Sequence, residues 1–174
     1  MKTLLVDGYN VLRSSGYYSH VTERAPDHTD DAFNAGRDAL IADVATFAGR
    51  EYEATIVFDG AGNPGSTGEP EKVAGIQVIF SPAGVSADSV IEELARKASE
   101  KGREILVITS DAATQWTVLG GKVTRMSAAG FANEMQIVQR EVQEVSEQQV
   151  KKRTLGDRLS PDVRAAMEKM LRKK

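Results

Sequence analysis

The sequence predicts an α/β fold, a Rossmann-like three-layer sandwich with a mainly parallel central sheet. Two features predict it: short apolar runs rich in β-branched residues, and longer stretches with a 3.6-residue apolar period between them. Uninterrupted apolar runs are typical of strands that are buried on both faces, as in a parallel sheet. Their alternation with amphipathic helices predicts β–α–β units with right-handed crossovers.

Each strand is identified by a short apolar run that ends at a polar or turn residue. The strong runs are residues 3–6, 54–58, 76–80 and 105–109, and a weaker one is 122–126. The helical period appears in residues 30–50, 87–101, 112–119 and 128–150. Ser86 is the expected N-cap of the second helix and Gly102 its expected end. Residues 59–72, rich in glycine and proline, are expected to form a mobile loop.

The charge distribution divides the chain into an acidic body and a basic tail. Residues 151–174 carry nine basic and three acidic residues, whereas residues 1–150 carry 13 basic and 22 acidic residues. We therefore expect one α/β domain over 1–150 and a basic helical tail over 151–174. Such a tail is either a nucleic-acid handle or a solubilising amphipathic helix, and charge alone leaves both interpretations open.

Several function classes are excluded by composition. The chain has no cysteine, which excludes disulfides, thiolate metal sites and a cysteine nucleophile and fits a reducing compartment. The first apolar run has only three residues, too few for a signal peptide, and no run approaches the roughly 20 residues of a membrane span. We expect a cytoplasmic protein with no membrane partner.

Aspartates follow the predicted strands. Asp7, Asp59 and Asp111 come at the ends of three strong strands, and Asp88 begins the helix after the fourth. Because the carboxyl ends of parallel strands meet at one edge, these four carboxylates are predicted to converge in a cleft. Converging carboxylates repel one another unless a cation compensates them. Each aspartate taken alone also has a structural interpretation, as a helix cap or turn residue.

The chemistry of these donors favours Mg²⁺ or Mn²⁺, because both ions prefer oxygen ligands. A divalent ion held by carboxylates can activate water for attack on a phosphodiester. Other mechanisms fit less well. The glycine-rich residues 60–67 lack the lysine of a phosphate-binding loop, and the chain has no Gly-x-Ser-x-Gly motif.

Four segments in this order resemble the YacP-like NYN proteins, a branch of the PIN-like nuclease superfamily. They are Leu4–Val11 (LLVDGYNV), Phe58–Asp59, Ser86–Glu92 (SADSVIE) and Ile108–Asp111 (ITSD). The resemblance covers residues 1 to about 150 and implies a metal-dependent endoribonuclease that hydrolyses phosphodiester bonds in RNA. A Gram-positive member of the family cuts mRNA on the ribosome, so mRNA and the ribosome are the implied partners and DNA is not.

Residue roles also follow from this resemblance. Asp7 and Asp88 resemble the central metal ligands, and Asp111 completes the acidic set. Asn10 resembles the amide that orients a ligand or the scissile phosphate, and Asp59 supports the site. Glu92, four residues after Asp88, is either a further ligand or a solvated side chain. The glycine-rich segment after Asp59 departs from the family pattern, which puts substrate positioning there in question.

Candidates for RNA contacts are the basic residues Arg13, Arg37, Lys151, Lys152 and Arg153. The position of Arg37 on an apolar helix stripe also fits a structural role. Tyr17, Tyr18 and Trp116 are candidates either for stacking on bases or for core packing. Two alternative functions remain open: a non-catalytic RNA- or ribosome-binding adaptor, and a nuclease for structured RNA such as tRNA or rRNA.

Overall fold

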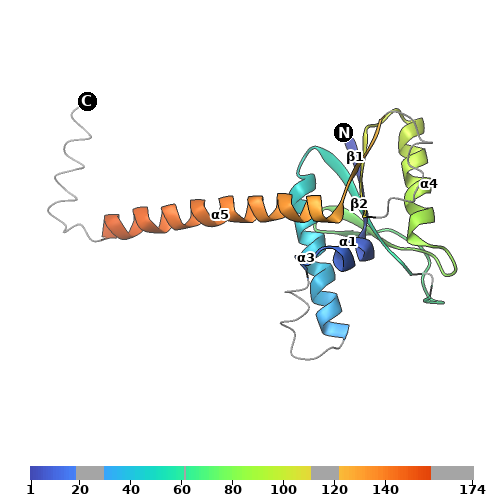
Figure 1. The fold of residues 1–174 in the computed structure, drawn as a ribbon, viewed down its shortest axis with the longest axis horizontal. Coiled ribbons are helices and arrows are strands. Elements are labelled where there is room, and N and C mark those ends of the chain that lie inside the picture. Colours follow the sequence, from blue (N-terminus) through green and yellow to red (C-terminus); the bar gives the residue numbers. More distant parts are fainter. Residues whose placement is uncertain (19–29, 61, 111–121, 158–174) are drawn as a thin grey trace. The chain divides into compact units, whose positions relative to one another are not determined.

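The computed structural model of the chain describes residues 1–18, 30–60, 62–110 and 122–157 (Figure 1). The chain comprises two compact units, Met1–Met135 and Gln136–Lys174. The first unit is the α/β domain. The described part of the second unit continues a helix that begins in the first. Within the described ranges, no helix is long and apolar enough to cross a membrane.

One sheet organises the first unit, with the strand order β3–β4–β2–β1–β5–β6. The strands are β1 (Lys2–Asp7), β2 (Tyr52–Phe58), β3 (Glu71–Val73), β4 (Ile76–Phe80), β5 (Ile105–Ile108) and β6 (Val123–Met126). All neighbours are parallel except β3, which lies antiparallel to β4 at one edge. The mainly parallel sheet and its five predicted strands are thereby confirmed. The three-residue β3 is too short to show a hydrophobic period.

The helices are α1 (Gly8–Ser14), α3 (Asp30–Ala48), α4 (Ala87–Glu100) and α5 (Ala128–Asp157). Ser86 caps α4 as predicted, because its hydroxyl accepts a hydrogen bond from the backbone N–H of Ser89 at 3.2 Å. Gly102 follows the end of α4 with a φ of 69°, a left-handed conformation that favours glycine. Helix α1 was not predicted, and the predicted helix over 112–119 lies outside the described residues.

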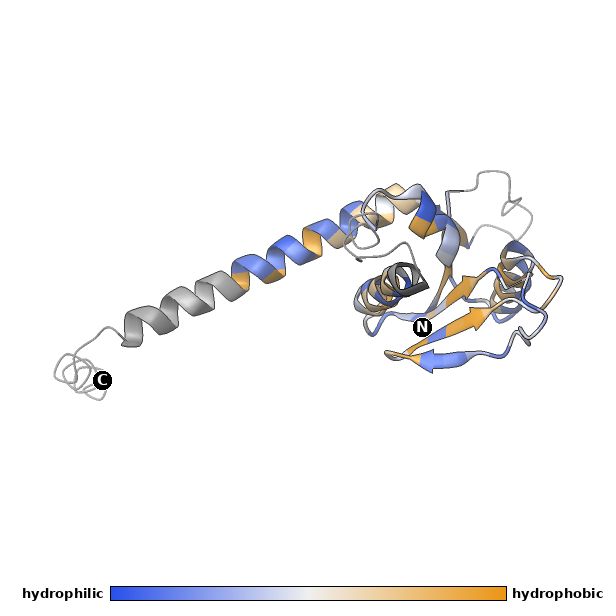
Figure 2. Cartoon of the chain, turned by 90° about the horizontal axis from the view of Figure 1, so that it is seen from below, coloured by the Kyte–Doolittle hydropathy of each residue, from blue (hydrophilic) through white to orange (hydrophobic). Residues whose placement is uncertain are grey.

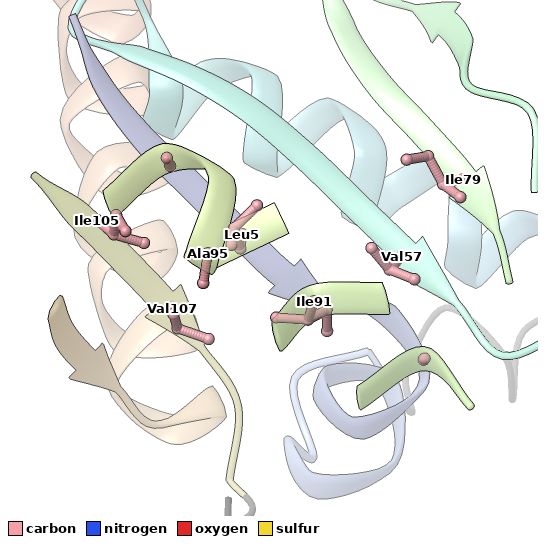
Figure 3. Close-up of a cluster of buried hydrophobic side chains, with 9 residues drawn as sticks. Leu5, Val57, Ile79, Ile91, Ala95, Ile105 and Val107 are labelled. Atoms are coloured by element: carbon pink, nitrogen blue, oxygen red, sulfur yellow. The ribbon is translucent and has the colours of Figure 1, made fainter. Parts of the chain in front are cut away.

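The core has two halves, one on each face of the sheet. On one face α4 covers the strands, and Figure 3 shows Ile91 and Ala95 of this helix among side chains of four strands. On the other face lie α1, α3 and the first turns of α5, which bury Leu40, Val44 and Phe131. Figure 2 shows central strands of the sheet in orange, as the most continuously hydrophobic part of the domain. The three-layer sandwich is thus the observed architecture.

Candidate active site at the carboxyl edge of the sheet

A cleft of about 400 Å³ opens at the carboxyl ends of the strands. Its described lining residues come from the ends of β1 and β2, from α1 and from the start of α4: Asp7, Tyr9, Asn10, Arg13, Ser14, Asp59, Ala87 and Asp88. The structure therefore brings three of the four predicted aspartates to one cleft. The fourth, Asp111, lies outside the described residues.

Asp7 combines a structural and a site position. It ends β1, is only 9% exposed, and its Oδ1 accepts a hydrogen bond of 3.1 Å from the backbone N–H of Asn10. Asp7 is therefore the N-cap of α1, where a carboxylate satisfies one of the unpaired N–H groups of the first turn. The same side chain lines the cleft, so the cap fixes a carboxylate at the sheet edge.

Asn10 joins two strand ends. Its Oδ1 accepts a hydrogen bond of 2.7 Å from the backbone N–H of Ser110, the second residue after β5. The hydroxyl of Ser110 in turn accepts from the backbone N–H of Ala128 at 3.2 Å, at the start of α5. Because the carbonyl oxygen of Asn10 holds a backbone N–H, the amide NH₂ is the group that this side chain has for a bound phosphate.

Asp88 lies in the first turn of α4 and is half-buried. An anion is favoured there because the backbone N–H groups of the first turn carry partial positive charge. Glu92, one turn further along α4, is exposed and is not among the described residues that line the cleft.

The segment after Asp59 is fastened to the end of β4. The backbone N–H of Gly60 donates to the hydroxyl of the buried Ser81 at 2.9 Å, and the hydroxyl of Ser66 donates to the carbonyl oxygen of Ser81 at 2.8 Å. A Cβ on Gly68, whose φ is 78°, would overlap the ring of Pro82. The described part of this segment is thus anchored by specific contacts at the end of β4, and the mobility that its composition predicts stays a prediction. Asp59 itself is exposed at the rim of the cleft.

The aromatic and basic candidates divide between structural and cleft positions. Tyr18 is 1% exposed and donates a hydrogen bond of 3.0 Å to Asp43, so its role is core packing. Arg37 is half-buried and donates a hydrogen bond to the side-chain oxygen of Asn34. Its guanidinium carbon lies over the ring of Phe80, 5.5 Å from the ring centroid. Arg13 lines the cleft.

Other candidates lie wholly or partly outside the described residues. Trp116 lies outside the described residues. The backbone of Lys151, Lys152 and Arg153 belongs to α5, and their side chains are outside the described part.

The donors at this cleft suit a hard divalent cation. They are carboxylate oxygens, with no thiolate or imidazole among the described lining residues. Among the described residues, however, no three acidic or histidine side chains come together closely enough to hold a metal. Asp7 and Asp88 are therefore the two described residues that fit the predicted ligand set, and that set needs Asp111 for its third carboxylate.

Comparison with known proteins supports this architecture. The family model for the YacP-like NYN domain matches residues 4–172. The Bacillus subtilis (strain 168) protein YacP is 28% identical over 143 residues, which is 82% of this chain and 80% of that protein.

Two crystal structures of Rae1 (YacP) from Bacillus subtilis share the fold. One has a TM-score of 0.63 at 26% identity and covers 99% of this chain and 96% of the other. The second, a tryptophan-to-leucine variant, has a TM-score of 0.65 at 24% identity and covers 98% and 99%. The sequence resemblance is confirmed, and the family match extends beyond residue 150 into the basic tail. The chain belongs to the YacP-like NYN domain family, whose domain is of the nuclease type.

Proposed function

We propose that this protein is a Mg²⁺- or Mn²⁺-dependent endoribonuclease that cleaves mRNA on the ribosome in the cytoplasm. The observation that carries the proposal is the meeting of Asp7, Asp59 and Asp88, from three separate elements, in one cleft of a nuclease-type domain. A structural role explains a single capping aspartate, but it gives no reason for three carboxylates to line the same cleft.

In this mechanism Asp7, Asp88 and Asp111 would hold the divalent ion, and Asp59 stands at the rim. Such an ion would supply an activated water and neutralise charge on the scissile phosphate. Asp7 is held rigidly for this role, because its cap bond to Asn10 fixes the carboxylate against β1. Asn10 fixes the end of β5 through Ser110, and its NH₂ group would be the donor to a phosphate oxygen. No histidine or lysine base is required.

Calorimetry with Mn²⁺ tests the site first. The Asp88→Asn variant removes one charge from the cleft, and Glu92→Gln on the same helix is the matched control, since Glu92 does not line the described cleft. We expect saturable binding by the wild type and Glu92→Gln, and none by Asp88→Asn. Loss of binding in both variants would place Glu92 among the ligands. No binding by the folded wild type would favour an adaptor without catalysis.

Cleavage assays then test the reaction. Asp7→Asn keeps a side-chain oxygen for the cap of α1, because asparagine and aspartate cap helices equally well. An enzyme loses cleavage of ribosome-bound mRNA in this variant and retains ribosome binding. An adaptor behaves as the wild type does. Cleavage of free tRNA or rRNA with no cleavage of mRNA on ribosomes would instead favour a nuclease for structured RNA.

The basic tail, residues 151–174, is proposed to dock the protein on ribosomal RNA. Its net charge of +6 contrasts with −9 for residues 1–150, so the tail supplies the attraction to phosphates that the body lacks. Deleting the tail should weaken co-sedimentation with ribosomes and flatten its salt dependence. Unchanged co-sedimentation would exclude this role.

A further inference from the structure

The described lining of the cleft carries more negative than positive charge. Asp7, Asp59 and Asp88 line it, and Arg13 is the one cationic side chain among its described lining residues. A divalent ion at the carboxylates would compensate the phosphate that is being cleaved. It would do little for the next phosphate of an RNA chain, which would still meet an acidic surface. A polynucleotide therefore needs a second cation at this rim.

Arg13 is held in place by an aromatic ring. Its guanidinium carbon lies 5.7 Å from the ring centroid of Tyr9, one helical turn earlier in α1. The Tyr9 ring packs against Phe58 with a centroid distance of 5.1 Å, and Phe58 is fully buried. The ring of Phe58 occupies the space beside Gly8 where any Cβ would sit. The platform beneath Arg13 is thus fixed to the core of the domain.

The guanidinium is available for an anion. Arg13 is exposed, and no described carboxylate forms an ion pair with it. Stacking on a ring uses the face of a guanidinium and leaves its in-plane N–H donors, which match the geometry of a phosphate. The ring also restricts the side chain before binding, so less conformational entropy is lost on contact.

The distance along α1 between Asp7 and Arg13 indicates which phosphate Arg13 would meet. Arg13 comes six residues after Asp7, or about 9 Å along a helix axis. We propose that Arg13, held over Tyr9, binds the phosphate next to the scissile one, so that the site selects a polynucleotide chain over an isolated phosphodiester. This inference rests on the proposed nuclease function, and it adds a residue that determines substrate class.

Two substrates separate this role from a structural one. A short single-stranded oligoribonucleotide offers neighbouring phosphates, whereas bis(p-nitrophenyl) phosphate offers one phosphodiester. For Arg13→Gln with Mn²⁺, we expect the ratio of kcat/KM for RNA to kcat/KM for the small substrate to fall about tenfold or more, the size expected for a lost charge-assisted hydrogen bond. Arg13→Lys should recover only part of the loss, because lysine lacks the planar fork.

Arg50→Gln is the matched control, since it makes the same charge change in the turn before β2, at the opposite edge of the sheet. This variant should keep the wild-type ratio. An equal fall for both substrates in Arg13→Gln would mean that Arg13 supports the fold or the metal site, and it would overturn the inference. An unchanged ratio would also overturn it.

A failure of the proposed function is recognised separately, because the wild type would then hydrolyse neither substrate. The inference is then tested by fluorescence anisotropy of a labelled oligoribonucleotide at increasing salt. Loss of one phosphate contact should reduce the slope of log K against log salt by about 0.7 in Arg13→Gln and leave it unchanged in Arg50→Gln. Equal slopes, or no binding by the wild type at low salt, would overturn the inference.

Discussion

The side chain of Asn10 holds the backbone of Ser110 through a hydrogen bond of 2.7 Å, although 100 residues separate them in the chain. Asn10 belongs to α1, just after β1, and Ser110 follows the neighbouring β5. The bond therefore fixes two adjacent strand ends at the edge where the cleft opens. Asn10 acts as a positioning residue in this arrangement, because its oxygen is engaged by the protein itself.

Two substitutions of Asn10 should separate its role as an acceptor from Ser110 from its proposed role as a donor to phosphate. Asn10→Ala leaves the N–H of Ser110 without this acceptor, and we expect a loss of about 1 kcal/mol in the free energy of unfolding, measured in urea. Asn10→Asp keeps an acceptor oxygen but loses the NH₂ donor, so stability should largely return while RNA cleavage stays impaired. Recovery of cleavage in Asn10→Asp would contradict a donor role toward phosphate.

Gly8 is required by the ring of Phe58. A Cβ at Gly8 would lie well inside contact distance of Cε1 and Cδ1 of this buried ring. Gly8→Ala should therefore lower the free energy of unfolding by about 1–3 kcal/mol through overpacking, although alanine is the better helix former. Gly16→Ala is the control, because its Cβ would meet no described atom within 4 Å. Equal stabilities of the two variants would show that the ring moves aside without cost.

A second substitution tests the cause of the Gly8 effect. Shortening Phe58 to leucine makes room beside residue 8, so Gly8→Ala should cost less in the Phe58→Leu background than in the wild type. A double-mutant cycle measured by urea unfolding gives this coupling directly. Additive effects would place the strain elsewhere in α1.

The sequence predicts well what depends on periodic burial. The parallel strands are visible as apolar runs because both faces of the sheet are covered, and α4 is marked by Ser86 at its start and Gly102 after its end. Asp7, Asp59 and Asp88 were predicted to meet, because strand ends of a parallel sheet share an edge. Helix α1 was not predicted, since seven residues barely complete two turns and its apolar period is too short to recognise.

Contacts between distant segments could not be predicted in the same way. Composition marks residues 59–72 as loop, but their anchoring depends on Ser66 and Ser81, which have no local signal for pairing. Likewise, the packing of Arg13 on Tyr9 and of Tyr9 on Phe58 depends on the register of β1 against β2. The sequence leaves Tyr18 open between base stacking and packing, and its burial and its contact with Asp43 decide for packing.

Ser81 is expected to hold the segment after Asp59 in place. Ser81→Ala leaves the N–H of Gly60 without its acceptor, which should cost about 1–3 kcal/mol in stability because the bond is buried. The same change should speed cleavage of the Glu71–Lys72 bond by a glutamate-specific protease, since the segment opens more often. Ser66→Ala removes only a donor to a carbonyl oxygen and should have a smaller effect. Unchanged proteolysis in Ser81→Ala would mean that Pro82 and Gly68 suffice to hold the segment.

The contact between the buried Tyr18 and the half-buried Asp43 makes the stability of the fold decrease at alkaline pH. Burial, reinforced by the carboxylate of Asp43, raises the pKa of Tyr18 well above its usual 10.0. In the unfolded chain Tyr18 ionises near pH 10, whereas in the folded protein it keeps its proton. The stabilisation is therefore complete below pH 10 and falls as the pH rises above it, by about 1.4 kcal/mol per pH unit.

The Tyr18→Phe variant tests this pH dependence of stability, because phenylalanine fills nearly the same volume and does not ionise. At pH 8 the variant should be about 1 kcal/mol less stable than the wild type, for want of the hydrogen bond to Asp43. Between pH 10 and 11 urea unfolding should show this difference closing, since only the wild type loses stability through residue 18. Asp43→Asn should keep most of the wild-type slope, because burial is the larger cause of the shift. Parallel pH profiles for the wild type and Tyr18→Phe would show that Tyr18 ionises as readily in the folded protein as in the unfolded chain.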